Sequence, residues 1–314
     1  MSSEIPNRRA VIDIGTNSVK VLVGDLAAEG RLTPICEISR QTRLGAGFYG
    51  TQKLQRSAIA LTAEAVAEFH ASAAKLGASS IRVIATSAAR DARNADELIE
   101  AVRQRTGLEM EILSGDMEAE WTFRGVTSNP SLAQSPVLIL DVGGGSTEFI
   151  VGDQAVPQFR SSYSLGTVRL LEQLHLNDPP GLAALAECRA WLKDFLTTQV
   201  VPFLDPALRA CRGPVRLVGT GGTATILARI ETRMAGFDRD KIEAAEISLA
   251  RIQSHLHEQW QMTLTQRQQI IGMPPNRGDV VLTGMAIYES IMTQFGLAQL
   301  GVSTRGLRYW ALLH

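Results

Sequence analysis

The sequence has few cysteines and no motif that would use them together. Cys36, Cys188 and Cys211 are widely spaced, odd in number and include no CxxC pair. This pattern argues against a disulfide framework and against a cysteine-ligated zinc site, and it favours a reducing compartment. We therefore expect a cytoplasmic protein.

Other signatures are missing as well. The five histidines show no metal-binding spacing, no Walker A lysine motif is present, and no apolar run approaches the length of a membrane span. The first residues run straight into an apolar stretch, so we expect no signal peptide. A formal charge of −1, from 31 basic and 32 acidic residues, gives no general attraction to nucleic acid or membranes. We expect neither DNA nor a membrane as partner.

What the chain does contain is a thirteen-residue pattern that occurs twice. Residues 13–25 read DIGTNSVKVLVGD and residues 141–153 read DVGGGSTEFIVGD. In each copy an apolar run ends in an aspartate, a turn of small polar residues follows, and a second apolar run comes next. This order predicts a β-hairpin with an acid at the end of its first strand. The identical pairs are Asp13/Asp141, Gly15/Gly143, Ser18/Ser146, Val23/Val151, Gly24/Gly152 and Asp25/Asp153.

The repeated hairpin suggests a clamp for a phosphorylated ligand. A turn of Gly, Ser, Thr and Asn can wrap backbone N–H groups around phosphate oxygens, and Asp13 and Asp141 can hold a divalent cation between them. Aspartates at strand ends also cap turns without any ligand. Two copies with matching neighbours favour the functional interpretation, in which the two turns face each other across a cleft.

The order of elements also repeats in the two halves. In the first half we expect a helix over 54–76, a strand over 81–86 followed by a turn to Arg90, and a helix with Asn94 and Glu97 as a capping box. In the second half the strand 216–218 and the turn Gly219–Thr223 take the places of the strand 81–86 and its turn.

A length of 314 residues suits two domains of ordinary size. We expect an N-terminal lobe over 1–125 and a C-terminal lobe over 126–303, with the polar, proline-bearing residues 126–136 as the link. A terminal helix, 304–314, should bury Leu307, Trp310 and Leu313 and pack back on the first lobe.

Five motifs together carry a resemblance to a known family. They strongly resemble those of the exopolyphosphatase/guanosine pentaphosphate phosphatase family, whose members belong to the actin, hexokinase and heat-shock ATPase superfamily, and the likeness runs from Val11 to 308. The resemblance implies an α/β fold of two duplicated actin-like (ribonuclease H-like) lobes with mixed sheets and an interlobe cleft, in the short form of the family. The motifs are DIGTNS (13–18), TSAAR (86–90), SGDMEAE (114–120), DVGGGSTE (141–148) and GTGGT (219–223).

The resemblance also implies residue roles. Glu118 would activate the attacking water, and the helix dipole near its predicted position favours the ionised carboxylate. Asp141 is linked to Mg²⁺, with Glu148 at the far end of the same turn and Asp13 as its counterpart in the other hairpin. The implied phosphate-binding residues are Thr16, Asn17, Ser18, Arg90, Gly143, Gly144, Gly145 and Ser146, and the implied further contacts to polyphosphate are Arg43, Gly221, Gly222 and Thr223.

Three positions depart from the pattern of many relatives. Met117 stands where a second glutamate is common, Glu120 where an arginine is common, and Thr304 where an aspartate is usual. Met117 removes a carboxylate beside the implied catalytic one, which bears on metal handling and rate.

The leading hypothesis is a Mg²⁺-dependent exopolyphosphatase that releases terminal orthophosphate from inorganic polyphosphate, from guanosine pentaphosphate of the stringent response, or from both. One alternative is an ATP-dependent kinase or ATPase with an adenosine pocket around Gly221 and Gly222. Another is a non-catalytic sensor of polyphosphate or the guanosine nucleotide. The segment 219–224 also matches a dinucleotide fingerprint, but no second strand with an acid follows at the required distance. The sequence does not decide between the two substrates, and a homodimer stays open.

Overall fold

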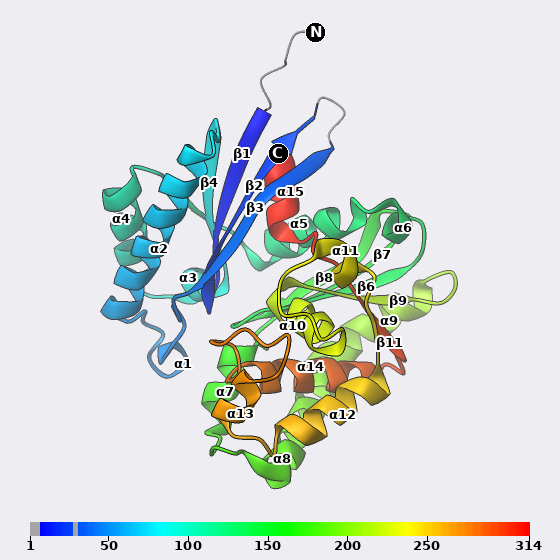
Figure 1. Ribbon diagram of the computed structural model, residues 1–314. Helices are drawn as coiled ribbons and strands as arrows, with labels where there is room; N and C mark the ends of the chain where they lie inside the picture. Colours follow the sequence, from blue (N-terminus) through cyan, green and yellow to red (C-terminus); the bar gives the residue numbers. More distant parts are fainter. Residues whose placement is uncertain (1–6, 28–30) are drawn as a thin grey trace. The chain divides into compact units, whose positions relative to one another are not determined.

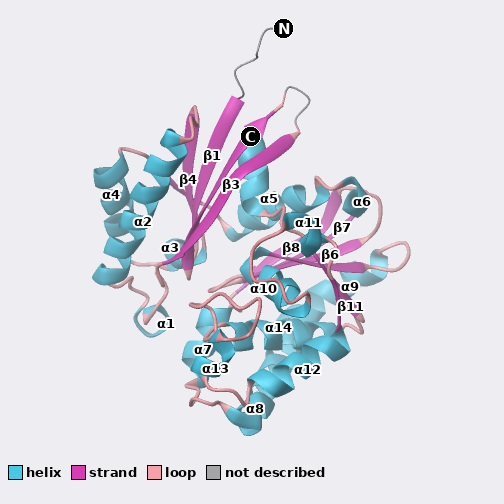
Figure 2. Cartoon of the chain, in the orientation of Figure 1, coloured by secondary structure: helices cyan, strands magenta, loops and turns pink. Residues whose placement is uncertain are grey.

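The computed structural model describes residues 7–27 and 31–314. The chain divides into two compact units. The first takes the described residues up to Gly125 together with Leu307–His314, and the second is Val126–Gly306. Figure 1 follows the chain through both, and Figure 2 distinguishes their helices from their strands. Within the described part of the chain, no helix is long and apolar enough to cross a membrane.

The first unit is built on a five-stranded mixed sheet of order β3-β2-β1-β4-β5. The pairs β1–β2 and β2–β3 are antiparallel, whereas β1–β4 and β4–β5 are parallel. The strands are β1 (Asn7–Ile14), β2 (Ser18–Leu26), β3 (Leu32–Gln41), β4 (Ser80–Ala85) and β5 (Met110–Ile112); the helices are α1 (Phe48–Thr51), α2 (Arg56–Lys75), α3 (Ser87–Asp91), α4 (Ala95–Thr106), α5 (Gly115–Thr127) and α15 (Leu307–Leu313).

Strand β1 is buried on both faces because helices cover both sides of this sheet. Successive strand residues point to opposite faces. Ile12 therefore packs with the apolar residues of α2 and α4, while Val11 packs with Leu307 and Leu312 of α15. Figure 1 shows α2 and α4 side by side on one face of the sheet and α15 on the other.

The second unit holds a six-stranded mixed sheet of order β10-β11-β9-β6-β7-β8. Its strands are β6 (Val137–Val142), β7 (Thr147–Asp153), β8 (Val156–Tyr163), β9 (Arg216–Thr220), β10 (Glu246–Ser248) and β11 (Gln299–Val302). Its helices are α6 (Pro130–Ala133), α7 (Thr167–Leu174), α8 (Gly181–Phe195), α9 (Val201–Ala210), α10 (Gly221–Glu231), α11 (Arg239–Glu243), α12 (Leu249–Gln259), α13 (Leu264–Gln268) and α14 (Val281–Gln294), and a π-helical turn, Leu196–Val200, joins α8 to α9.

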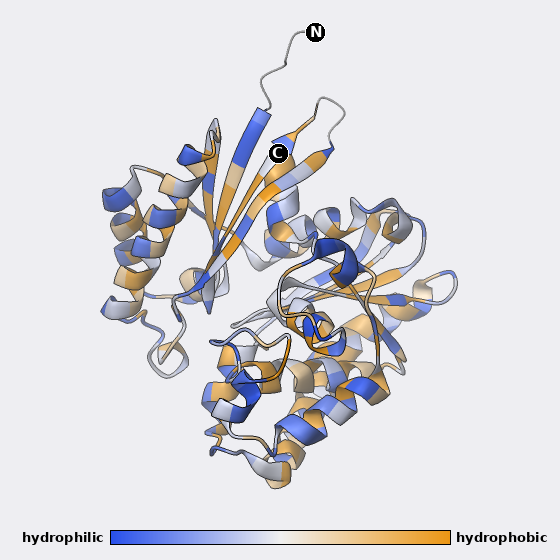
Figure 3. Cartoon of the chain, in the orientation of Figure 1, coloured by the Kyte–Doolittle hydropathy of each residue, from blue (hydrophilic) through white to orange (hydrophobic). Residues whose placement is uncertain are grey.

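Helix α14 lies at the centre of the second unit. All of its residues from Val281 to Met292 are buried, and its ribbon carries mostly hydrophobic colours in Figure 3. A mostly apolar helix that is buried around its whole circumference belongs inside a core. Its side chains pack with Leu140 and Phe149 of the sheet and with Trp260 after α12, all fully buried.

The sequence repeat is a structural repeat. The Gly15 N–H donates to the Ser18 carbonyl at 3.0 Å, and the Gly143 N–H donates to the Ser146 carbonyl at 3.0 Å. The next strand pair shifts register between Val23 and Gly24 in one copy and between Val151 and Gly152 in the other. The repeated glycine thus marks a β-bulge in both. Two mixed sheets with shared strand order confirm the predicted α/β class.

Several local predictions need correction. The residues after β4 form the short helix α3 rather than a turn, and α10 begins at Gly221, inside the predicted turn Gly219–Thr223. Asn94 is the N-cap residue of α4, but its side chain makes no capping hydrogen bond and no capping box forms. Its side chain instead accepts from the Leu54 N–H at 2.8 Å and donates to the Leu54 carbonyl at 3.1 Å.

The terminal helix and the link also differ from expectation. Helix α15 begins at Leu307, and its buried residues are Leu307, Tyr309, Ala311 and Leu312. Leu307 is thus buried as predicted and the partly buried Leu313 packs against the same cluster, whereas Trp310 is not part of it. The predicted link 126–136 contains the end of α5 and all of α6. Asn129 begins α6 by accepting a hydrogen bond from the Ser131 N–H.

Leu312→Ala should weaken the first unit. Leu312 is 1% exposed between α15 and the sheet, and emptying such a site costs about 2–5 kcal/mol of unfolding free energy. Leu61→Ala is the matched control, because Leu61 on α2 is 47% exposed and should change stability by no more than about 0.5 kcal/mol. Urea unfolding measures both. Equal effects would mean that α15 does not contribute to the core of this unit.

Candidate active site

In the first unit the predicted site residues follow strand ends that lie at one edge of the sheet. Strands β1, β4 and β5 are parallel neighbours, with Ile14 opposite Ala85 and Ala85 opposite Ile112. The carboxyl ends of neighbouring parallel strands carry the ligand sites of many α/β proteins. The hairpin turn, the segment around Arg90 and the start of α5 therefore leave the sheet at the same edge.

The first hairpin turn is bound through its carbonyl groups by the loop after β3. The Gly45 N–H donates to the Thr16 carbonyl at 2.8 Å, and the Arg43 N–H donates to the Asn17 carbonyl at 3.1 Å. Within residues 7–27 and 31–314, the backbone N–H groups of Thr16 and Asn17 and the amide nitrogen of the Asn17 side chain have no acceptor. Buried donors of this kind suit an anionic ligand, because an unpaired buried donor is costly.

Close contact between the loop and the turn explains a glycine. A Cβ at position 45 would lie 2.3 Å from the Thr16 Cγ2, so a larger residue would push the loop off the turn. Thr16, Asn17 and Ser18 are 4%, 6% and 4% exposed. The Arg43 backbone thus helps hold the turn, although its side chain is exposed.

Arg90 and Glu118, predicted from separate motifs, are brought together. The Arg90 Nη1 donates to the Glu118 Oε2 at 2.8 Å and to the Leu113 carbonyl at 3.2 Å. Glu118 is 8% exposed and lies in the first turn of α5, where the Ser114 hydroxyl accepts from the Met117 N–H. The Arg90 guanidinium and the N-terminal end of the helix thus both favour a negatively charged group at this place.

Asp13, the last acid of β1, is the second carboxylate of this unit. Burial raises the pKa of its carboxyl, while the charges of Lys20 and Arg308 act to lower it. In the part of the chain that the structure describes, its buried Oδ1 has no hydrogen-bond partner. An unsatisfied buried carboxylate oxygen is a natural ligand for a cation or its bound water.

The second unit repeats the arrangement. The Thr167 N–H donates to the Gly143 carbonyl at 2.9 Å, the Val168 N–H donates to the Gly144 carbonyl at 2.9 Å, and the Arg169 Nε donates to the Gly145 carbonyl at 2.9 Å. These donors follow β8, as Arg43 and Gly45 follow β3. Over the described stretches of the chain, the N–H groups of Gly144 and Gly145 have no acceptor.

Asp141 and Glu148 face each other across the second hairpin. They are direct partners in the β6–β7 register, so their side chains point to the same face a few ångströms apart. Glu148 is 1% exposed and accepts from the Ser162 hydroxyl at 2.6 Å. This pair offers two carboxylates of the kind that Mg²⁺ uses alongside water and substrate oxygens.

The GTGGT segment packs against this hairpin. Gly221 has φ of +80°, and a Cβ there would lie 2.2 Å from the Asp141 Oδ1, so Asp141 fits only beside glycine. The Thr223 hydroxyl donates to the Val142 carbonyl at 3.0 Å. Burial and the Asp141 charge raise the pKa of Tyr288 well above its usual value, which keeps its hydroxyl neutral as it donates to the Leu140 carbonyl.

The residues fit a magnesium site of few protein ligands. Among the described residues no group of three or more His, Cys, Asp and Glu side chains is gathered for a metal. Mg²⁺ typically binds through about one or two carboxylates and keeps several waters. The Asp141–Glu148 pair of the second unit fits this requirement, and so, in the first unit, does the Asp13 carboxylate with its unpartnered Oδ1. The roles of these residues stay predictions, as does the meeting of the two turns and of Glu118 with Asp141.

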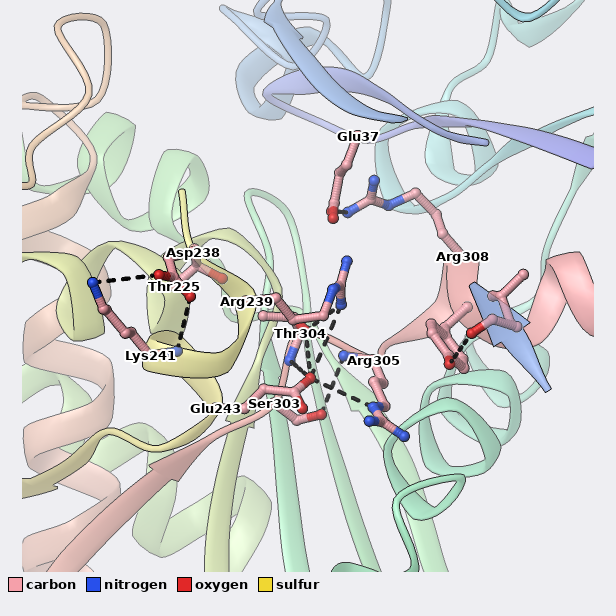
Figure 4. A network of polar contacts seen from close by, with 12 residues as sticks. Glu37, Thr225, Asp238, Arg239, Lys241, Glu243, Ser303, Thr304, Arg305 and Arg308 are labelled. Atoms are coloured by element: carbon pink, nitrogen blue, oxygen red, sulfur yellow. Dashed lines mark hydrogen bonds and ion pairs between the residues drawn. The ribbon is translucent and has the colours of Figure 1, made fainter. Parts of the chain in front are cut away.

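Sequence reasoning missed Glu243, which explains the Thr304 departure. Thr304 donates to the Glu243 carboxylate through its hydroxyl and, at 3.2 Å, through its N–H. The same carboxylate lies 3.6 Å from the Arg305 Nε and 4.0 Å from the Arg239 Nη1, as Figure 4 shows. A carboxylate from α11 thus stands beside position 304, where the family pattern led us to expect an aspartate. The contact between Glu243 and Thr304 has no local sequence signal, because the two residues are 61 positions apart.

Comparisons with known proteins agree on one family. The profile of the Ppx/GppA phosphatase family matches residues 8–312. A Mycobacterium tuberculosis protein named exopolyphosphatase 2 is 32% identical, with 94% of each chain covered. An Aeromonas salmonicida guanosine-5'-triphosphate,3'-diphosphate pyrophosphatase is 26% identical over 95% of this chain and 57% of its own length.

Solved structures show the same likeness. An exopolyphosphatase from Cytophaga hutchinsonii superposes with a TM-score of 0.86 at 26% identity, with 97% of this chain and 96% of that chain covered. The Aquifex aeolicus member of the Ppx/GppA family gives a TM-score of 0.78 at 27% identity, covering 98% of this chain and 96% of that one. The actin-like fold that the resemblance implied is confirmed by these structures.

Gly221→Ala should displace Asp141. The new Cβ would overlap the carboxylate and would need a left-handed backbone, which together lower the unfolding free energy by about 1–3 kcal/mol. Gly236→Ala is the control, because nothing lies within 4 Å of a Cβ there. Chemical denaturation compares the two. An unchanged midpoint for Gly221→Ala would show that the contact with Asp141 is not a constraint.

Thr304→Asp, which introduces the residue that the family pattern led us to expect, should be harmful in this chain. It removes a hydroxyl donor and sets a second carboxylate against Glu243, so the unfolding free energy should fall by about 1–3 kcal/mol. Thr304→Ser keeps the hydroxyl and should be near neutral. Adding Glu243→Gln to Thr304→Asp should restore most of the loss. Additive losses in the double variant would contradict the assignment.

Proposed function

The chain belongs to the Ppx/GppA phosphatase family, and from that membership we propose that it hydrolyses the terminal phosphoanhydride bond of inorganic polyphosphate or guanosine pentaphosphate and releases orthophosphate. One observation carries the proposal. Each unit presents a turn whose carbonyls are held from one side, while the N–H groups of Thr16 and Asn17 in one turn and of Gly144 and Gly145 in the other have no acceptor among the described residues. Each turn follows a strand with an aspartate next to its last residue. A phosphate chain is an anion that such turns suit.

Phosphate binding is assigned to both turns. In the first, Thr16, Asn17 and Ser18 supply the buried donors. In the second, the residues are Gly143, Gly144, Gly145 and Ser146, with Gly221, Gly222 and Thr223 as further contacts. Arg43, in the loop that holds the first turn, would contact the phosphate chain further out. Because every phosphoryl unit offers the same oxygens, backbone donors can bind polyphosphate without regard to length.

Charge neutralisation is assigned to Arg90 and Mg²⁺. The transition state of phosphoryl transfer spreads negative charge over the phosphoryl oxygens, so catalysis depends on positioning and on positive charge. Asp141, Glu148 and Asp13 would hold Mg²⁺, which would neutralise part of this charge. Arg90 is already fixed by Leu113 and Glu118, and a fixed guanidinium loses little freedom when phosphate arrives.

Water activation is assigned to Glu118. The carboxylate accepts a proton from water as the water oxygen bonds to the terminal phosphorus. The bridging P–O bond breaks, and its electron pair leaves with the shortened phosphate chain. The Arg90 contact at 2.8 Å holds the carboxylate in one orientation, which places the base before substrate binds.

The substrate preference follows from the relatives. The relative named exopolyphosphatase 2 is covered over 94% of its length, whereas the guanosine nucleotide pyrophosphatase is covered over 57%. This favours polyphosphate as the main substrate, with guanosine pentaphosphate, and so the stringent response, as the second candidate. Three free thiols support a cytoplasmic site of action.

A side-by-side assay decides among the candidate functions. Phosphate release from polyphosphate and from guanosine pentaphosphate is compared with and without Mg²⁺, and ATP is the third substrate. Turnover of either of the first two supports the proposal. Turnover of ATP alone would select the kinase or ATPase alternative, and tight binding of polyphosphate without turnover would select the sensor.

Glu118→Gln should remove the base while keeping size and packing. We expect kcat to fall by about two orders of magnitude or more, with little change in polyphosphate affinity, because the group acts in the transition state. Glu120→Gln is the control on the same helix, since Glu120 pairs with Arg124 at 2.9 Å. Steady-state kinetics and equilibrium binding measure the two effects. Near-normal turnover in Glu118→Gln would assign the base elsewhere.

A further inference from the structure

Arg308 of α15 lies among the acids of the first sheet. Its Nη2 donates to the Glu37 Oε1 on β3 at 2.8 Å, as Figure 4 shows. Its Nε lies 3.9 Å from the Asp13 Oδ2 on β1. The side chains of Arg308, Asp13 and Glu37 are 16%, 13% and 21% exposed. The last helix of the chain thus places a cation beside the first predicted metal ligand.

The two distances have different meanings. At 2.8 Å the contact with Glu37 is a hydrogen-bonded ion pair, whereas 3.9 Å to Asp13 is too long for a hydrogen bond and is an electrostatic contact. Glu37 therefore keeps the guanidinium outside hydrogen-bonding distance of Asp13. A guanidinium bonded directly to Asp13 would occupy the oxygens that a ligand needs.

Two buried atoms remain without partners at this place. Across residues 7–27 and 31–314, neither the Asp13 Oδ1 nor the Arg308 Nη1 has a hydrogen-bond partner. The Asp13 oxygen is a negatively charged hydrogen-bond acceptor, and the Arg308 nitrogen is a positively charged hydrogen-bond donor. Because unpaired buried groups of this kind are costly, their persistence points to a ligand or its bound water as the missing partner.

We propose that Arg308 is a positioning residue for Asp13, and that Glu37 holds the Arg308 guanidinium at the distance that orients and neutralises the carboxylate without covering it. The inference rests on the proposed function, in which Asp13 serves the cation. Lys20 stands opposite Asp13 in the hairpin register, so the cluster holds two acids and two bases. Helix α15 is thereby part of the site as well as of the core.

Packing alone does not need Arg308. Leu307, Tyr309, Ala311 and Leu312 are buried against the sheet. The Tyr309 hydroxyl donates to the Leu32 carbonyl at 3.2 Å. A second arginine, Arg9, reaches the Leu312 and Leu313 carbonyls at 3.4 and 3.5 Å without meeting Asp13. Arg308 can therefore be changed while α15 stays docked, and Arg9 provides a matched control.

The test compares Arg308→Met, Arg308→Lys, Glu37→Gln and Arg9→Met in the full chain. Two readouts are used: the Mg²⁺ concentration that half-saturates polyphosphate hydrolysis, and the Mg²⁺-dependent rise in unfolding temperature without substrate. Loss of a residue that orients a ligand typically costs about 10–100-fold in metal affinity or activity. We expect that range for Arg308→Met, a smaller loss for Arg308→Lys, and a change within about twofold for Arg9→Met.

Glu37→Gln separates positioning from charge. It releases the guanidinium to bind Asp13 directly, so the half-saturating Mg²⁺ concentration should rise several-fold while kcat at saturating Mg²⁺ is kept. If Arg308→Met and Arg9→Met shift both readouts equally, the contact is structural and the inference is wrong. If the wild-type protein hydrolyses neither substrate, the proposed function fails, and the substrate-free Mg²⁺ shift still decides the role of Arg308.

Discussion

The candidate site depends on hydrogen bonds that hold the carbonyl groups of two turns. In the first unit Gly45 and Arg43 donate to Thr16 and Asn17, and in the second the residues after β8 do the same for Gly143 and Gly144. Once the carbonyls are bound, the remaining polar groups of each turn are donors. Backbone N–H groups then give each turn its positive character, with the Arg169 guanidinium bound to the Gly145 carbonyl in the second turn. Such local donors reconcile a nearly neutral chain with a polyanionic ligand.

Close packing around the carboxylates keeps these turns in place. Gly221 and Gly45 leave no room for a Cβ beside Asp141 and Thr16. Arg90 fixes Glu118, and Ser162 fixes Glu148. The Glu118 and Glu148 carboxylates are therefore oriented before any ligand binds. This reduces the free-energy cost of reorganising the site during the reaction.

Long-range partners account for the residues that motifs overlooked. Glu243 meets Thr304 from 61 residues away, and Arg308 meets Glu37 from 271 residues away. Glu243 thus sets a carboxylate beside Thr304, and Glu37 holds Arg308 near the predicted site residue Asp13, without any local sequence signal. A departure such as Thr304 is therefore understood only together with the residue that faces it, because the carboxylate is supplied by a different helix.

The sequence alone determined the repeated hairpin, the α/β class and the family, because an apolar run, an acid and a small polar turn are local features that occur twice. It misplaced the capping of α4 and the buried face of α15, because Asn94 bonds to Leu54 and the helix presents Tyr309 rather than Trp310 to the sheet. Only the tertiary structure joined Arg90 to Glu118 and Arg308 to Asp13 and Glu37. Such pairs depend on the order of the strands and on where the helices pack. These bring together residues that are far apart in the sequence, and no periodic pattern in the sequence links them.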